Sequence, residues 1–210
     1  MNRNHLKWSA LCIAAIVTGC ATFPDAQTTR QATEKMVSED FTAPAPELLK
    51  RLTQDRSQQI CSKIGDAKLT QDEAAEVVKL ARESFRYPTG KLVGDWKRGD
   101  ALAHDGAGDR IQGGQLEKRK ENGGLCQNCH GLAPDEINVG NVGPALTAYG
   151  TQRGNSEAIA KYTYEKIFNA WAYFPCSIMP RLGATGHLTP EQITHLVAYL
   201  IDPQSPINKK

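Results

Sequence analysis

The residues best suited to chemistry are two cysteines and a histidine in the stretch Cys126-Gln-Asn-Cys129-His130. Two cysteines separated by two residues and followed at once by histidine form the attachment signature of c-type haem. One helical turn lets both thiols reach the two vinyl groups on one edge of a porphyrin, and His130 then points its imidazole at the iron. The motif predicts one covalent haem c, attached through Cys126 and Cys129 and ligated by His130.

Two other chemistries use a Cys-x-x-Cys pair. A dithiol redox site is typical of a strand-helix context and needs no histidine in the next position. A zinc site needs a second Cys or His pair at short range, and the sequence has none. Both alternatives are therefore weaker than haem.

A second axial ligand is expected well downstream of the motif. Met179 is the only methionine after residue 36, and Pro180 follows it in a loop that Gly183 bounds. A thioether in such a rigid loop suits a haem ligand. The rival ligands are His187, His195 and His104; of these, His195 lies beside the apolar stripe of the last predicted helix, which favours a structural role.

Pro144, in the stretch Asn141-Val-Gly-Pro-Ala-Leu146, is the predicted partner of His130. A ligating histidine needs an acceptor for its free ring N–H, which fixes the tautomer and the ring angle. Proline has no N–H but retains its carbonyl. The alternative is an ordinary loop turn.

The N-terminus reads as an export signal. Arg3 and Lys7 precede a short apolar core over 8–17, and Val-Thr-Gly-Cys20 resembles a lipobox. We expect a lipoprotein signal peptide over 1–19, a mature chain that begins at lipidated Cys20, and a periplasmic protein anchored to a membrane. Ordinary signal cleavage nearby is the alternative.

The charge balance does not support nucleic-acid binding. The chain has 25 basic and 23 acidic residues, and removal of Arg3 and Lys7 with the signal leaves 23 of each. A near-neutral mature chain lacks the basic excess that nucleic-acid binding requires.

Counting cysteines predicts a disulfide. Of six cysteines, Cys12 leaves with the signal, Cys20 is lipidated and two belong to the motif. Cys61 and Cys176 remain, and two leftover thiols in an oxidising compartment favour one disulfide.

The patterning predicts an all-α fold that carries a helical extension. We expect a flexible tether over 20–46, a helical extension over 47–93 and a monohaem domain over 94–204. Helical periodicity and capping signals predict helices over 47–65, 70–86, 95–103 and 155–174 and from Thr189 onward. A glycine-rich insertion over 105–124 is expected to be an exposed loop, and no segment shows useful strand-like alternation.

The order of these motifs resembles class I cytochrome c over about residues 94–202. The pattern comprises Cys126-x-x-Cys129-His130, then Asn141-x-Gly-Pro144-x-Leu146, then Met179-Pro-Arg181, and then Leu188-Thr-x-x-Gln192 with Val197-Ala-Tyr-Leu200. Within that class, "NVGPAL" and the stretch 176–208 are similar to the SoxX family, the small haem subunits of SoxAX complexes.

The resemblance implies a function in bacterial thiosulfate oxidation. Members pair with a SoxA subunit, and the complex, an L-cysteine S-thiosulfotransferase, couples thiosulfate to a cysteine of the SoxYZ carrier. The SoxX-type subunit has no catalytic residues of its own and passes electrons to a small cytochrome c. It also implies His130 and Met179 as iron ligands. The extension, the insertion and the lipobox go beyond this family pattern.

Two other functions remain open. One is a stand-alone, membrane-tethered periplasmic electron shuttle. The other is a catalytic haem protein in which a free Cys176 near the iron acts as a sulfur nucleophile. Lys118, Arg119 and Lys120, in the insertion that leads into the motif, are candidates for the rim of a docking face, although a solvated charged loop explains them equally well.

Overall fold

The computed structural model describes residues 25–40, 52–65, 68–112, 115–137 and 140–209. The chain divides into two compact units, residues 1–42 and 43–210, and each is described by itself. Cys20 lies outside the described residues, and so do Leu48 and Leu49, near the start of the predicted helix over 47–65. No helix in the described ranges has the length and apolar character that a bilayer crossing requires.

The first unit contains helix α2, Ala26–Asp40, within the segment that the sequence predicts to be a flexible tether. The Asp25 carboxylate accepts a hydrogen bond from the Thr28 N–H at 2.9 Å, which caps the helix start. The described side chains of α2 are exposed except for half-buried Val37. The structure thus places a helix with mostly exposed side chains in part of the predicted tether.

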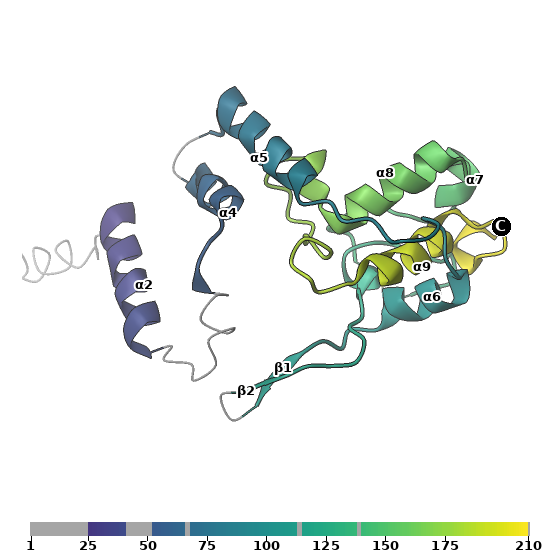
Figure 1. Cartoon of the computed structure of the whole chain (residues 1–210), viewed down its shortest axis with the longest axis horizontal. Coiled ribbons are helices and arrows are strands. Elements are labelled where there is room, and N and C mark those ends of the chain that lie inside the picture. The colour runs from purple at the N-terminus through teal and green to yellow at the C-terminus, as the bar shows by residue number, and fades with distance from the viewer. Residues whose placement is uncertain (1–24, 41–51, 66–67, 113–114, 138–139, 210) are drawn as a thin grey trace, which may run out of the picture. The chain divides into compact units, whose positions relative to one another are not determined.

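The second unit is all-α apart from one short hairpin (Figure 1). Its α-helices are α4 (Arg56–Cys61), α5 (Gln71–Glu83), α6 (Trp96–His104), α7 (Tyr149–Arg153), α8 (Glu157–Phe168) and α9 (Pro190–Ile201). Its 3-10 turns are η2 (Ser62–Gly65), η3 (Cys126–Asn128), η4 (Ala170–Ala172) and η5 (Pro206–Asn208). The predicted caps of two helices are present, because Thr70 and Thr189 each form a complete capping box.

Helices α6 and α9 cross closely and position the rest of the unit. A Cβ at Gly99 would lie 1.9 Å from the His195 carbonyl oxygen, so only glycine allows this approach. The Asp95 N–H donates to His195 Nδ1 at 2.8 Å, which fixes the start of α6 on α9. The crossing is therefore set by a missing side chain and a directional hydrogen bond.

The core lies between α6, α8 and α9. Tyr164, Ile193 and Val197 are fully buried, and Leu132, just after the Cys-x-x-Cys-His motif, is buried with them. The motif is thus attached directly to the core.

Three elements differ from the sequence prediction. The predicted helix over 47–65 is interrupted in its described part, because Asp55 caps a new helix, α4. The predicted helix over 155–174 ends at Phe168, where the Asn169 side chain accepts from the Trp171 N–H and starts η4. The insertion contains an antiparallel hairpin, β1 (Arg110–Gln112) and β2 (Gln115–Glu117), which projects from the helices in Figure 1.

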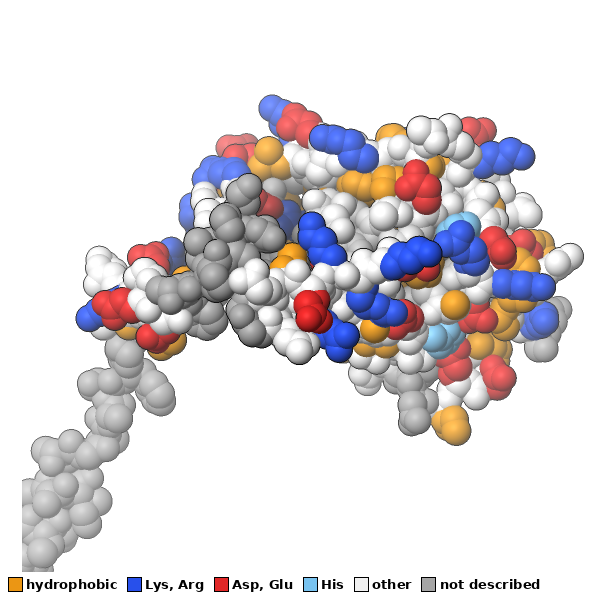
Figure 2. Space-filling model, turned by 60° about the horizontal axis from the view of Figure 1, so that its bottom comes forward, with side chains coloured by type: hydrophobic (Ala, Val, Ile, Leu, Met, Phe, Trp, Pro, Cys, Tyr) orange, Lys and Arg blue, Asp and Glu red, His pale blue; other side chains and the backbone are white. Residues whose placement is uncertain are grey.

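On the face that Figure 2 shows, Lys and Arg side chains are interspersed with Asp and Glu side chains. Arg98 pairs with Glu121 and Arg119 with Asp105, so part of the basic charge near the insertion is neutralised locally.

Candidate haem-attachment site

The Cys-x-x-Cys-His motif forms one tight turn. Leu125 adopts a left-handed conformation with φ 44°, after which η3 begins at Cys126. The Cys126 carbonyl accepts from the N–H groups of Cys129 at 3.1 Å and His130 at 3.0 Å. The two thiols and the imidazole consequently project from a single turn, and all three line the same cavity.

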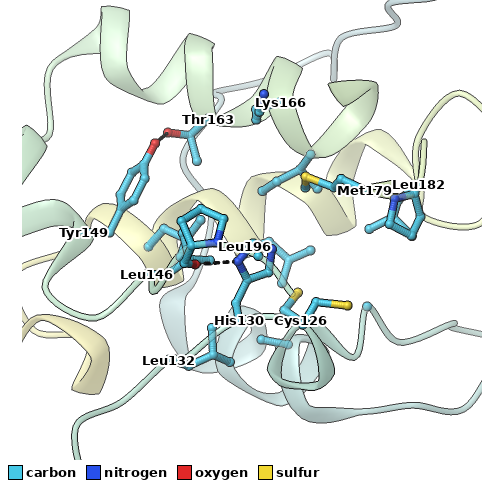
Figure 3. A pocket seen from close by; sticks show the side chains of 18 of the residues that line it. Cys126, His130, Leu132, Leu146, Tyr149, Thr163, Lys166, Met179, Leu182 and Leu196 are labelled. Atoms are coloured by element: carbon cyan, nitrogen blue, oxygen red, sulfur yellow. Dashed lines mark hydrogen bonds between the residues drawn. The ribbon is translucent and has the colours of Figure 1, made fainter. Parts of the chain in front are cut away.

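That cavity has a volume of about 550 Å³ and largely apolar walls. The motif supplies one wall, the Gly143–Leu146 loop and α8 supply others, and the segment from Phe174 to Leu182 completes the lining with α9. In Figure 3, His130 and Met179 extend into the cavity from different sides, and Cys126 lies beside His130. Its volume lies in the range of small-molecule and cofactor sites.

His130 is held in one orientation. Its Nδ1 lies 2.7 Å from the Pro144 carbonyl oxygen, which can only accept, so Nδ1 carries the proton and Nε2 is left for a ligand. The predicted hydrogen bond is therefore present. Gly143 packs directly on the ring, because a Cβ there would lie 2.3 Å from His130 Cε1.

Met179 is the thioether that the fold brings to this cavity. Its N–H donates to Ser177 Oγ at 3.2 Å, and the Ser177 carbonyl accepts from Trp171 Nε1 at 2.6 Å. These bonds fix the backbone just before Met179.

The rival histidines lie elsewhere, since none of the three lines the cavity. His187 Nε2 donates to the Gly123 carbonyl at 2.9 Å. His195 accepts from the Asp95 N–H. His104 contacts Asp100 and Glu136 through its two ring nitrogens.

The motif thiols do not suit the alternative chemistries. Burial raises the pKa of Cys126 to about 11, whereas a dithiol redox site needs a lowered thiol pKa. Within the described ranges, no three His, Cys, Asp or Glu side chains come close enough together to hold a metal ion, which leaves zinc without a complete ligand set.

Two cationic side chains that the sequence analysis did not select line the cavity. Lys166 lies over the Phe174 ring at 3.9 Å, and burial lowers the pKa of its amine. Arg153 lies over the Tyr149 ring at 5.1 Å. The predicted helix over 155–174 includes Lys166, whereas no helix is predicted at Arg153, and only the tertiary fold shows that both reach the cavity.

The predicted disulfide between Cys61 and Cys176 is present, with an S–S distance of 2.10 Å and a Cα–Cα distance of 5.3 Å. Cys176 is therefore not a free thiol. The hypothesis of a free Cys176 nucleophile is wrong for this oxidised form of the chain.

Exposed apolar side chains form part of the rim of the cavity. Val142, Phe174 and Ile178 line the cavity and are 60%, 61% and 80% exposed. Lys118 and Lys120 do not line it, and neither does Arg119, which pairs with Asp105 at 3.3 Å. Among the described residues of the insertion, Gly124 alone lines the cavity, and Leu125, which follows the insertion, lines it too.

The fold and cavity define an all-α protein whose Cys-x-x-Cys-His turn, imidazole and thioether converge on one apolar site. No family model matches the chain. A curated relative, an uncharacterized lipoprotein of Aquifex aeolicus (strain VF5), is 40% identical over 157 residues, which cover 74% of this chain and 73% of the relative. The protein therefore belongs to the same lipoprotein family, and this membership indicates attachment to a membrane.

Proposed function

We propose that this protein is a monohaem c-type cytochrome that transfers electrons in the periplasm while anchored to a membrane. The observation that carries the proposal is the convergence of Cys126, Cys129, His130 and Met179 on one apolar cavity. A haem held there supplies a one-electron couple at its iron.

The residues present fit that group. Cys126 and Cys129 would attach it, His130 and Met179 would ligate the iron, and the Pro144 carbonyl already holds the His130 ring. Lys166 and Arg153 form no salt bridge with the residues that the structure describes, so both are available to the two acidic side chains of a haem. The apolar walls exclude water from the haem, so little solvent has to reorganise when the iron changes its oxidation state.

Two protein ligands would leave no open iron position for a substrate, and this favours electron transfer over catalysis at the haem. The finer proposal is that of the sequence resemblance. The chain is the SoxX-type subunit of a SoxAX complex, with a SoxA-like partner, transient contact with the SoxYZ carrier, and a small cytochrome c as acceptor. The residue patterns around Pro144 and Met179 support this assignment.

A stand-alone membrane-tethered shuttle is the second candidate. Membership in a lipoprotein family favours it, because an anchored cytochrome with its own tether can deliver electrons without a fixed subunit. Both candidates share the same haem site and differ in their partners.

The test of the shared proposal is the mass and spectrum of the exported protein. We expect an added mass of one haem that survives denaturation, a low-spin spectrum, and a weak near-infrared sulfur-to-iron band in the ferric state. Met179→Ala should remove that band and lower the reduction potential by a sizeable part of the ~0.8 V range that axial ligands span. A protein without covalent haem, or a band that survives in Met179→Ala, would contradict the proposal.

A further inference from the structure

The segment that carries Met179 is held on both sides by one short stretch of the N-terminal extension. Before Met179, Cys176 is bonded to Cys61 at the end of α4. After it, Arg181 Nη2 lies 2.8 Å from Asp55 Oδ2, at the start of α4. The six-residue helix α4 and its cap, Asp55, thus carry both anchors that flank the thioether.

In the second anchor, Arg181 is well packed, whereas its partner Asp55 is 51% exposed. The Arg181 side chain is only 12% exposed and its guanidinium lies 4.4 Å from the centre of the Trp171 ring. Trp171 Nε1 in turn donates to the Ser177 carbonyl. The ion pair is therefore connected, through one ring and one hydrogen bond, to the backbone that carries Met179.

The extension is itself fixed to the domain, so it can restrain the loop that carries Met179. Ile60 in α4 and Val77 in α5 are fully buried. Ser84, directly after α5, accepts a hydrogen bond at 3.0 Å from Asn169 Nδ2, and Asn169 Oδ1 accepts from the Trp171 N–H. The same turn, η4, thus receives both the extension and the Met179 segment.

We infer that α4 is a clamp that positions Met179, with the Cys61–Cys176 disulfide and the Asp55–Arg181 ion pair as its two contacts. The inference rests on the proposed haem function. A loop that is fixed at both ends has few conformations in which the thioether has left the cavity, so an external ligand competes poorly for the iron. None of the four residues touches the cavity, and all four act through the loop that carries Met179.

The test uses the full-length, haem-loaded protein and two clamp variants. Asp55→Asn removes the charge but keeps the helix cap, because asparagine caps as well as aspartate. Cys61→Ser with Cys176→Ser removes the covalent contact. The matched control is Glu76→Gln, which breaks the 2.8 Å Arg56–Glu76 ion pair in the same extension without reaching the loop.

Two quantities are measured in each protein. One is the apparent Kd of imidazole for the ferric protein, followed by loss of the near-infrared band. The other is the hydrogen-exchange rate of the amides between Ser177 and Leu182, which reports loop opening whether or not iron is ligated. We expect imidazole to bind about threefold more tightly to Asp55→Asn and at least about tenfold more tightly to the double serine variant, with faster exchange in both and no change in Glu76→Gln.

The outcomes separate the clamp from the haem proposal. Absence of haem or of the near-infrared band in the unaltered protein would refute the function, and the exchange rates would still decide whether α4 restrains the loop. Unchanged imidazole affinity and exchange in Asp55→Asn would overturn the clamp, even if stability fell. If the double serine variant does not fold, Asp55→Asn alone decides.

Discussion

At the scale of single residues, the candidate site depends on how His130 is oriented. The ring is fixed by a hydrogen bond to the Pro144 carbonyl on one side and by the backbone of Gly143 against its face. A fixed ring leaves Nε2 in one position, which lowers the cost of ligand binding. His130 therefore depends on Gly143 as much as on its hydrogen-bond partner.

Gly143→Ala should displace the imidazole. A Cβ at this position would lie 2.3 Å from Cε1 and 2.6 Å from Nδ1 of His130, distances that force the ring to move. We expect a loss of about 1–3 kcal/mol in the free energy of unfolding by urea, and a smaller fraction of chains that carry haem. Gly90→Ala is the control, because its Cβ would meet nothing within 4 Å. Equal haem content in both variants would show that the ring tolerates the methyl group.

The residues of the haem motif could be found from the sequence because their chemistry is encoded in adjacent positions. The Cys61–Cys176 pair could be found because the other four cysteines were already assigned. Lys166 and Arg153 could not, since a single lysine or arginine in a helix carries no signal of the cavity it will face. The apolar rim of Val142, Phe174 and Ile178 was missed for a similar reason, because scattered exposed apolar residues are ordinary in a sequence.

At the scale of elements, two histidines link separate segments of the chain in opposite charge states. His104 Nδ1 lies 2.7 Å from the Asp100 carbonyl oxygen and His104 Nε2 lies 2.9 Å from Glu136 Oε1. Both partners are acceptors, so both ring nitrogens must carry protons. Burial opposes that charge, but the Asp100 carbonyl and the carboxylates of Glu136 and Asp100 outweigh it, and the pKa of His104 is raised.

The bridge from α6 to Glu136 should therefore weaken in alkali. With a raised folded pKa, the contribution of His104 is complete below the ~6.5 of an unfolded histidine and is lost as pH rises through the folded pKa. We expect His104→Gln to cost about 1–3 kcal/mol in urea unfolding at acid pH and less above neutrality. A cost that is constant across pH would contradict the charged bridge.

His195 gives the matching comparison with the opposite sign. Its Nδ1 accepts from the Asp95 N–H, which requires the neutral ring. Burial and the nearby Arg98 charge lower the pKa of His195. Its contribution is complete above ~6.5 and is lost as pH falls toward the folded pKa, so the cost of His195→Asn should grow from acid to neutral pH.

Helix starts were predictable where a cap and its partner are close in sequence, as at Thr70 and Thr189. The end of α8 was not, because Asn169, whose side chain starts η4 there, also donates a hydrogen bond to Ser84, far away in the chain. The β1–β2 hairpin has three-residue strands, which are too short to produce a recognisable alternation. The crossing of α6 and α9 at Gly99 likewise depends on a contact nearly a hundred residues away.

At the scale of the whole molecule, the lipoprotein family and the lipobox together predict the mature N-terminus. We expect mass spectrometry of the membrane fraction to find a peptide that begins at a lipidated Cys20. Cys20→Ser should release the protein from membranes while leaving its absorption spectrum unchanged, because the haem site lies in the other unit of the chain. An unmodified N-terminus beyond residue 20 would contradict anchoring at this cysteine.

The partner decides between the two proposed functions. Because His130 and Met179 would occupy both axial positions of the iron, thiosulfate should not reduce the purified chain alone.

If the chain is the SoxX-type subunit, thiosulfate with a SoxA-like subunit and the SoxYZ carrier should reduce its haem. Ile178→Asp on the cavity rim should then slow that reduction about tenfold, because it disturbs the contact with the partner. Ile137→Asp is the control, because Ile137 is 94% exposed and does not line the cavity. An intact near-infrared band in Ile178→Asp would show that the neighbouring Met179 is undisturbed. Reduction by thiosulfate without partners would place catalysis in this chain, whereas no reduction with all partners present would favour the tethered shuttle.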